Sequence, residues 1–324
     1  MTRRRTDWTI AIALLGFVVA VAWSVGRVLT DRFAAIQYLH WIPTIAALVF
    51  TVLCALALRR STWTRCRRAL WTVALVQVGV FLLQDYRVLP PSRVDAGAAG
   101  PVIRVAHFNA NWPGQKAQAL GAALRDYFAS PRGEGSCDVF FVSEAGALLS
   151  DQYAGSFCGP DTRGIGIGRF GIVSRVPIVE ATLVFDDLKS TAALVRFAPW
   201  GGNPAWAALL VDLPSDPSAS RRETLLRLKE ILGARSIPEV DVIVGDFNTT
   251  RGAASLVAFA PTMRHAFTQA GIGLGATFPR ALPLWHIDHI LLAPNTTALR
   301  YAVVNLGVGK HCMQTATIRI ARTE

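Results

Sequence analysis

The chain has 324 residues, and 52% of them are hydrophobic, which is a high share for a soluble protein. Its formal net charge is +11, but residues 1–95 hold 12 of the 33 basic and 4 of the 22 acidic residues and so carry +8 of it. The remainder carries only +3, whereas a duplex-binding protein normally shows a dense basic face. Composition therefore disfavours a dedicated duplex-binding protein and leaves polyphosphate and lipid headgroup ligands open.

The hydrophobic excess is concentrated near the N-terminus. Residues 9–29 and 36–58 are each long enough to cross a bilayer and carry at most one charge. Residues 69–83 are shorter but uncharged, with aromatic residues near their ends, which favours a third span over an interfacial or core helix. A cleaved signal peptide fits poorly, because several hydrophobic segments follow one another without a clear cleavage site after the first. We predict a membrane anchor with three transmembrane helices over residues 1–89.

The placement of arginine predicts the orientation of this anchor. Three arginines precede the first span and five lie between the second and third, whereas the loop between the first two spans holds only Asp31 and Arg32, beside Arg27. By the positive-inside rule, the N-terminus and the second loop are cytoplasmic. Three spans then predict a multi-pass protein of the inner (plasma) membrane with an extracytoplasmic domain, and two spans would leave the domain in the cytoplasm. In an oxidising compartment Cys137 and Cys158 could pair, with two unpaired thiols as the alternative.

A stretch of proline and small residues over 90–101 is typical of a linker. Beyond it, residues 102–324 alternate strand-like apolar runs with two amphipathic helices. Helices are expected near 115–128 and 219–232, and strands at 102–109, 139–143, 170–174, 182–185, 192–197, 206–213, 240–245 and 287–293, with edge strands at 302–306 and 316–320. This pattern predicts an α/β domain with one large core.

Polar side chains stand where several of these strands end. Asn109, Glu144, Asp246 and Asp288 lie at or beside the ends of four apolar runs, and His311 stands alone before the last strand. Strand ends are where a rigid sheet presents side chains to a ligand crevice. Carboxylates, amides and a histidine that converge there suit a magnesium ion and a phosphate.

Two of these patterns carry a chemical interpretation of their own. Glu144 ends an apolar run, where a carboxylate costs free energy unless it binds something, and a salt-bridged surface glutamate is the alternative. Asp246 and Asn248 alternate with Phe247 and so point to the same side. That spacing suits one group that orients a water and another that hydrogen-bonds a phosphoryl oxygen, although a plain Asx turn has the same residues.

These motifs, in this order, resemble the endonuclease/exonuclease/phosphatase superfamily, which holds pancreatic-type deoxyribonucleases, apurinic endonucleases, bacterial sphingomyelinases and inositol-polyphosphate 5-phosphatases. The resemblance is carried by Asn109 after an N-terminal strand, Glu144 at the end of 138–144, the run 171–178, Gly-Asp246-Phe-Asn248, Ile-Asp288-His-Ile-Leu and His311 before a final strand. It covers roughly residues 101–324 and implies a four-layer α/β sandwich, two packed sheets flanked by helices, preceded here by the N-terminal helical transmembrane anchor.

The resemblance implies two metal ligands and one ion. Glu144 matches the metal-binding glutamate of the family, and Asn109 would assist the metal or the phosphate; a turn asparagine is the alternative for Asn109. Asn111 gains no role from the resemblance. The expected cofactor is Mg²⁺, with Mn²⁺ as the alternative, because Mg²⁺ sites combine one or two carboxylates with substrate phosphate and water.

The resemblance also implies four catalytic residues. Asp246 would activate the attacking water, while Asn248 and His311 would stabilise the developing charge. Asp288 matches the aspartate that orients the catalytic histidine of the family, and a histidine without such a partner is more often structural. The histidines expected to be structural are His107, His286 and His289.

Two residues depart from the family pattern. Asp212 stands where many members have a histidine, and Lys310 replaces an acidic residue before His311. An ammonium group at position 310 could bind a substrate phosphate or weaken metal binding by repulsion. These departures keep open a catalytically impaired member that acts as a phosphate-ligand binding module.

The sequence therefore predicts a membrane-anchored, Mg²⁺-dependent phosphoesterase. Its partners would be a phosphodiester or phosphomonoester substrate, either nucleic acid or a lipid headgroup, and the lipid bilayer, with no protein partner predicted. A role as a membrane-assembly protein is an alternative that only the anchor supports. The polar residues at the strand ends argue against it.

Overall fold

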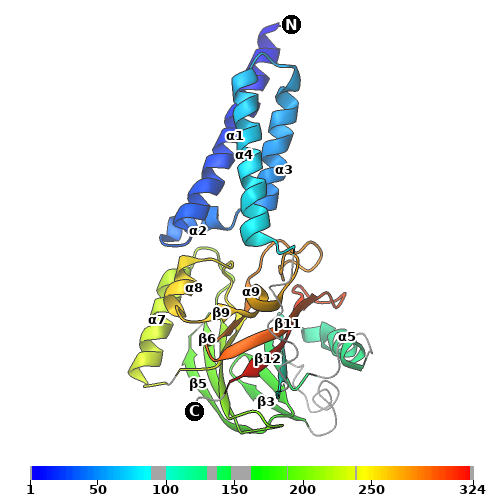
Figure 1. Cartoon of the computed structure of the whole chain (residues 1–324), viewed down its shortest axis with the longest axis vertical. Helices are drawn as coiled ribbons and strands as arrows, with labels where there is room; N and C mark the ends of the chain where they lie inside the picture. Colours follow the sequence, from blue (N-terminus) through cyan, green and yellow to red (C-terminus); the bar gives the residue numbers. More distant parts are fainter. Residues whose placement is uncertain are drawn as a thin grey trace.

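The computed structural model describes residues 2–88, 100–129, 137–146, 162–187, 189–237 and 239–321. These residues form an N-terminal bundle of helices that stands on one end of a two-sheet sandwich (Figure 1). The predicted linker, apart from its last two residues, and Cys158 lie outside the described residues.

The N-terminal bundle contains helices that are long and apolar enough to cross a membrane. Its elements are α1 (Thr2–Leu29), α2 (Ala34–His40), α3 (Thr44–Ala57), η1 (Leu58–Arg60), α4 (Thr64–Val80) and η2 (Phe81–Asp85). Two segments of 22 residues meet the criterion unbroken, Trp8–Leu29 and Thr64–Asp85, and a third meets it only if α2 is counted together with α3 and η1. Helices α1, α3 and α4 run side by side (Figure 1).

The segment predicted to span the membrane at residues 36–58 is bent rather than one straight helix. Helix α2 and the helix formed by α3 and η1 are bent by 67° at a short break, and Pro43 is the residue that caps α3. Proline lacks an N–H donor and restricts the residue before it, so a helix commonly ends just before one. The segment predicted at 69–83 is longer than expected and reaches Asp85.

Large apolar side chains cover the outside of the bundle. The exposed ones include Leu14, Val18, Val21, Leu53, Leu75 and Val76. One apolar cluster inside the bundle consists of Ala13, Cys54, Ala55, Leu58 and Leu70. Soluble proteins rarely expose so continuous an apolar surface, and this one suits contact with lipid.

The rest of the chain forms two mixed six-stranded sheets, which confirms the predicted four-layer α/β sandwich. The first sheet has the order β11-β12-β1-β2-β4-β3 and the second β5-β6-β7-β8-β10-β9. The strands of the first are β1 (Ile103–Asn109), β2 (Val139–Ser143), β3 (Arg163–Ile167), β4 (Phe170–Ser174), β11 (Thr296–Val304) and β12 (Met313–Ile320). Those of the second are β5 (Ile178–Asp186), β6 (Thr191–Phe197), β7 (Trp206–Asp212), β8 (Val242–Asp246), β9 (Arg264–His265) and β10 (Asp288–Leu292).

Helices cover the outer faces of the two sheets. These helices are α5 (Ala117–Ala129), which follows η3 (Gly114–Lys116) and packs on the first sheet, and α7 (Arg221–Ala234) and α8 (Ala254–Phe259), which pack on the second; α9 (Ala266–Ala270) contacts β11. Strand β2 shows how alternation builds the layers, because Phe141 lies in the core between the sheets while Phe140 and Val142 pack toward α5. The N-terminus of α7 is capped by Ser220, whose hydroxyl accepts from the Glu223 N–H.

Several strands differ from the sequence prediction. No strand was predicted at β3, which pairs along its whole length with β4, or at the short β9. Strand β12, predicted at an edge, lies inside the sheet between β1 and β11. Glycines in β3 and polar residues in β12, such as Gln314, hide the apolar alternation by which strands are recognised.

The corner between α1 and α2 is docked on the sandwich. The buried carboxylate of Asp31 accepts from the backbone N–H of Ser255 at 3.0 Å and from its hydroxyl. The indole N–H of Trp285 donates to the carbonyl of Trp41 at 2.8 Å. The anchor is therefore fixed to the loops at one end of the sandwich.

Gly245 lies where β8 passes close to the backbone of β7. A Cβ at this position would lie 1.8 Å from the Val211 carbonyl oxygen, and the φ of 150° is one that side chains rarely adopt. We expect Gly245→Ala to lower the free energy of unfolding by about 3 kcal/mol or more.

The control for this substitution is Gly233→Ala on α7, where a Cβ would meet nothing within 4 Å. Gly233→Ala should raise the free energy of unfolding by no more than about 1 kcal/mol. Denaturant or thermal unfolding of the full chain in detergent compares the two, and a similar change in both variants would contradict the packing assigned to Gly245.

Candidate active site

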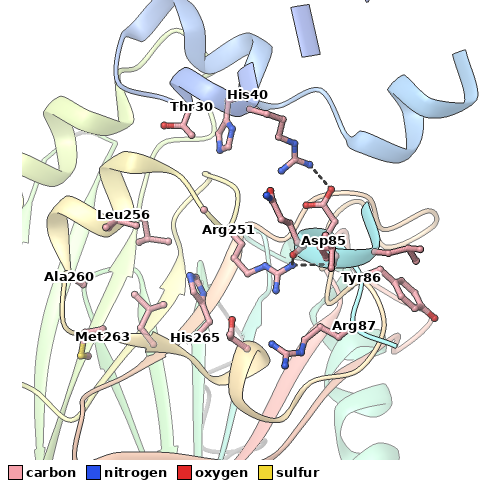
Figure 2. Close-up of a pocket in the computed structure, with 18 of the residues that line it drawn as sticks. Thr30, His40, Asp85, Tyr86, Arg87, Arg251, Leu256, Ala260, Met263 and His265 are labelled. Carbon is pink, nitrogen blue, oxygen red and sulfur yellow. Dashed lines mark hydrogen bonds and ion pairs between the residues drawn. The ribbon is translucent and has the colours of Figure 1, made fainter. Parts of the chain in front are cut away.

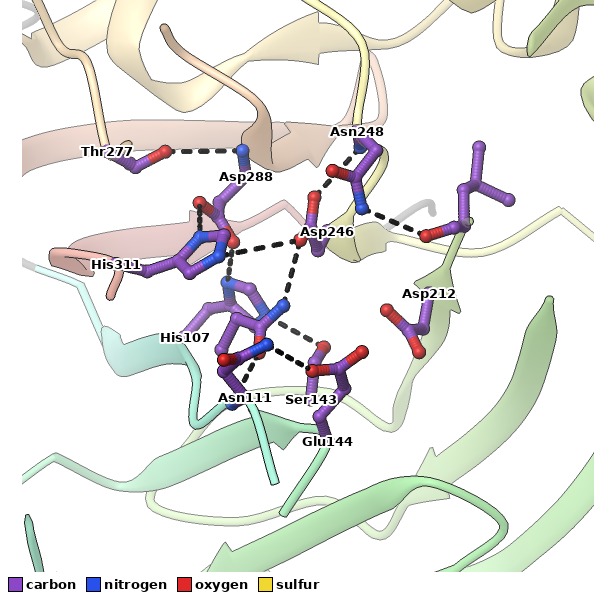
Figure 3. A network of polar contacts seen from close by, with 12 residues as sticks. His107, Asn111, Ser143, Glu144, Asp212, Asp246, Asn248, Thr277, Asp288 and His311 are labelled. Atoms are coloured by element: carbon purple, nitrogen blue, oxygen red, sulfur yellow. Dashed lines mark hydrogen bonds and ion pairs between the residues drawn. The ribbon is translucent and has the colours of Figure 1, made fainter. Parts of the chain in front are cut away.

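Three aspartates stand side by side across the second sheet. The strand register pairs Asp212 of β7 with Asp246 of β8, and Asp246 with Asp288 of β10. All three side chains are buried. The first sheet contributes Asn109 at the end of β1, whose amide donates to Asp246 Oδ2 at 2.8 Å (Figure 3). This hydrogen bond joins the two sheets at the site.

Asp246 is the most highly connected of these carboxylates. Besides Asn109, the backbone N–H of Asn248 donates to its Oδ1 at 2.8 Å, and His311 Nε2 lies 3.9 Å from its Oδ2. Burial, followed by the charge of Asp288, raises the pKa of Asp246 to about 7. A carboxylate with this pKa can accept a proton near neutral pH.

His311 and Asp288 form the pair that was predicted from their order in the chain. His311 Nδ1 lies 2.9 Å from Asp288 Oδ2, and the Asp288 N–H donates to the Thr277 hydroxyl at 3.4 Å. Burial acts to lower the pKa of His311, but Asp288, Asp246 and Glu144 outweigh it and raise the pKa to about 9. The imidazole is therefore a cation at neutral pH, surrounded by carboxylates.

Glu144 is held by a residue to which the sequence assigned no role. Asn111 donates through its side chain to Glu144 Oε2 at 3.1 Å, and through its backbone N–H to Asn109 Oδ1 at 2.8 Å. Asn111 thus links the two predicted metal ligands. A signal for it exists in the sequence, because Asn109 and Asn111 repeat the two-residue spacing of Asp246 and Asn248.

Unusual backbone conformations gather at the site. Of the six non-glycine residues with positive φ in the described part of the chain, four lie here: Asn111, Trp112, Glu144 and Asn248. Such conformations cost of order 1 kcal/mol or more each and persist only where the surroundings enforce them. Their concentration at one place marks a functional site rather than an ordinary sheet end.

Asp212, predicted as a departure from the family, lies within the site. Its Oδ2 is 3.5 Å from Arg169 Nη1, and its buried Oδ1 has no hydrogen-bond partner among the described residues. Burial, followed by the charges of Asp246 and Glu144, raises the pKa of Asp212 to about 8. The departure therefore places one more buried carboxyl group beside Asp246 and Glu144.

Asn248 and Lys310 lie toward the rim of the site. The Asn248 amide donates to the carbonyl of Leu213 at 2.9 Å, which fixes its orientation and uses one of its two N–H groups. The Lys310 side chain is exposed, and its backbone carbonyl accepts from the Arg280 N–H.

The donor set fits a divalent cation. One carboxylate oxygen each of Asp246 and Asp288 and a ring nitrogen of His311 lie within 4.8 Å of one another, with Glu144 and Asp212 around them. Four carboxylates thus share a site with one imidazolium. Asp212 and Asp288 each keep one buried oxygen without a hydrogen-bond partner in the part of the chain described. Buried oxygens with excess negative charge are the ligands that Mg²⁺ prefers.

The remaining histidines pack as core side chains. His286 and His289 stack with ring centroids 4.9 Å apart, and His289 Nε2 donates to the carbonyl of Thr249 at 2.9 Å. His107 Nε2 lies 3.0 Å from the Ser143 hydroxyl. One ring nitrogen of each of His265, His286 and His289 lies within 4.8 Å of those of the other two, and we call these residues the histidine trio.

Comparison with known proteins agrees with this geometry. Residues 106–311 match the model of the Endonuclease/Exonuclease/phosphatase family. Similar solved structures include an endonuclease/exonuclease/phosphatase family protein from Bacteroides thetaiotaomicron (16% identity, 69% of this chain and 100% of that chain, TM-score 0.51). A mannosyl-6-phosphatase from Bacteroides thetaiotaomicron VPI-5482 shares the fold, with 16% identity over 67% of this chain and 100% of that chain and a TM-score of 0.52. So does the human Nocturnin catalytic domain, with 14% identity over 72% of this chain and 100% of that chain and a TM-score of 0.51. No curated protein matches the sequence.

A two-sheet sandwich that gathers carboxylates, amides and a histidine–aspartate pair at one end is the architecture of metal-dependent phosphoesterases. The chain belongs to the Endonuclease/Exonuclease/phosphatase family. The superfamily predicted from the sequence motifs is thereby confirmed, and the protein is a hydrolase of phosphoester bonds.

The histidine trio makes stability depend on pH. Burial is the main cause that lowers the pKa of all three residues, to about 4 for His289 and well below 6.5 for His265 and His286. In the unfolded chain they titrate near 6.5, so the unfolded state binds more protons as the pH falls from about 6.5 toward 4. We expect the free energy of unfolding to fall by up to about 1.4 kcal/mol per pH unit for each histidine.

The Tm of the full chain in detergent, followed from pH 7 to pH 4.5, measures this loss. The variant His265→Phe should show a shallower decline. His311→Gln is the control, because the raised pKa of His311 makes its contribution disappear on the alkaline side instead. An unchanged slope in His265→Phe would contradict the assignment.

Proposed function

We propose that this protein is a membrane-anchored, Mg²⁺-dependent phosphoesterase whose catalytic domain lies outside the cytoplasm. It hydrolyses a phosphodiester or phosphomonoester, in nucleic acid or in a lipid headgroup. One observation carries the proposal: Glu144, Asp246 and the His311–Asp288 pair converge from distant segments of both sheets. The site they form holds more buried carboxylates than cations.

Glu144 and Asn109 hold the metal ion in this proposal, and Asp212 adds a carboxylate beside them. The side-chain amide of Asn111 keeps Glu144 oriented through the 3.1 Å contact. When bound, a divalent cation supplies Lewis-acid stabilisation of a phosphate oxygen. Mn²⁺ has the same preference for oxygen ligands and is the alternative ion.

The remaining residues move protons and stabilise charge. Asp246, with a pKa of about 7, orients a water and accepts its proton, while Asn109 holds the carboxylate in place. His311 is kept cationic by Asp288 and donates to the phosphoryl oxygens as negative charge develops. The free N–H of the Asn248 amide is a second donor.

The anchor supports an extracytoplasmic location. Two segments are long and apolar enough to span a membrane unbroken, and the bent pair α2 and α3–η1 supplies a third. Five arginines lie between residues 59 and 68, at the end of the bent pair and the start of α4, and three precede the first span. With an odd number of spans, the domain lies on the side of the membrane opposite to these arginines.

We expect Glu144→Gln to lower kcat by about 100-fold or more, because the substitution removes the charge and keeps the shape. The matched control is Glu230→Gln on the exposed surface of α7, which should keep full activity. Hydrolysis of bis(p-nitrophenyl) phosphate and p-nitrophenyl phosphate by the full chain, with Mg²⁺ or with EDTA, measures both the substitution and the metal requirement.

Activity that survives both EDTA and Glu144→Gln would overturn the mechanism. The competing function is a phosphate-binding module, which the Lys310 departure favours. It would show no turnover of either substrate while phosphate ligands still raise the Tm.

The orientation has its own test. A C-terminal fusion to alkaline phosphatase, which folds only outside the cytoplasm, should be active, and the same fusion to β-galactosidase should be inactive. The reverse pattern would place the domain in the cytoplasm and exclude three spans.

A further inference from the structure

A cavity of about 730 Å³ lies at the junction of the anchor and the sandwich. The anchor contributes residues from the end of α1, from α2 and from η2, and the sandwich contributes the loop after β8, α8 and β9 (Figure 2). None of the proposed catalytic or metal-binding residues lines it. The cavity is therefore separate from the active site.

The charges that line this cavity do not balance. Three arginines, Arg27, Arg87 and Arg251, face a single carboxylate, Asp85. Asp85 is bound to Arg27 at 2.5 Å, and Arg251 donates to the carbonyl oxygens of Gln84 and Asp85, at 2.6 Å and 3.0 Å, which carry no net charge. Two guanidinium charges are thus left without a carboxylate partner.

Arg87 is the side chain most available for a ligand. Its backbone is fixed by paired hydrogen bonds with Gly273, both at 2.9 Å, and its guanidinium makes no hydrogen bond or ion pair with the described residues. Figure 2 shows the guanidinium groups of Arg87 and Arg251 turned toward the same space as His265. Like charges that converge in a half-buried space repel each other unless an anion binds between them.

His265, the member of the histidine trio that lines this cavity, adds no charge. Burial lowers the pKa of His265 and of the other members of the histidine trio, and the charge of Arg251 lowers them further. The trio is thus neutral at physiological pH. The same guanidinium repels a divalent cation, so an anion suits this end of the cavity better than a metal ion.

The rim of the cavity is apolar and lies at the C-terminal end of the candidate span Thr64–Asp85. Leu82, Leu83, Val88 and Val257 are exposed around it, Leu83 at 87%. Leu82 and Leu83 belong to the candidate span Thr64–Asp85. Basic side chains below an apolar rim, at the end of a span, match the headgroup and the upper acyl chain of a phospholipid.

We propose that this cavity binds the phosphate headgroup of an anionic phospholipid, with Arg87 and Arg251 on the phosphate and Leu82 and Leu83 against the acyl chain. The inference rests on the membrane anchoring in the proposed function, and not on phosphoester hydrolysis. Because both anchor and sandwich line the cavity, a bound lipid bridges the two.

Native mass spectrometry of the full chain in detergent, titrated with dioleoyl-phosphatidylglycerol or dioleoyl-phosphatidylcholine, tests the proposal. Phosphatidylglycerol should bind the parent chain at least about tenfold more tightly than it binds Arg87→Ala. Arg87→Lys should keep most of the affinity. The matched control is Arg222→Ala, on the exposed face of α7 outside the cavity, which should bind as the parent does.

Three results would overturn the proposal: equal binding of phosphatidylcholine, an equal loss in Arg222→Ala, or equal affinity for soluble glycerol phosphate, which would identify a free phosphate ligand. Glu144→Gln separates the two proposals, because it should abolish hydrolysis and leave phosphatidylglycerol binding unchanged. An unchanged Tm of Arg87→Ala without lipid shows that the variant is folded, and added phosphatidylglycerol should raise the Tm of the parent chain only.

Discussion

The carboxylate of Asp246 is the point on which the rest of the site depends. It receives a hydrogen bond from Asn109 of the other sheet, and on its own sheet it lies in register between Asp212 and Asp288. Three buried aspartates at this spacing repel one another strongly. The fold tolerates them because the strands are rigidly paired and the imidazolium of His311 offsets part of their charge.

The loop after β8 connects this site to the anchor. It begins with Asn248, whose backbone holds Asp246, and continues with Thr249, whose carbonyl receives the ring N–H of His289. Two residues later, Arg251 donates to the end of the anchor. Thus a few consecutive residues contact Asp246, the histidine trio and the cavity between the anchor and the sandwich.

Most of the sandwich follows from local pattern, and the exceptions have physical causes. Apolar runs such as 139–143 are predicted correctly because both faces of the strand are buried. Strand β3 escaped prediction because its glycines carry no hydrophobic signal, and the break at Pro43 was hidden within a uniformly apolar stretch. In the site, Asn111 was assigned no role, because its two-residue spacing from Asn109 is a weak signal and its role depends on contacts with Asn109 and Glu144.

The sequence by itself determined the class of protein: its order of strand-end residues identifies the family, and its apolar segments and arginines predict an anchor. Only the tertiary structure shows where the Asp212 carboxyl group lies and which charges surround it. In the sequence it is a departure that weakens the case for catalysis, whereas in the fold it adds a carboxylate beside Asp246. The reason is that chain order records which groups are present, while the electrostatic effect of a group depends on its distance from other charges.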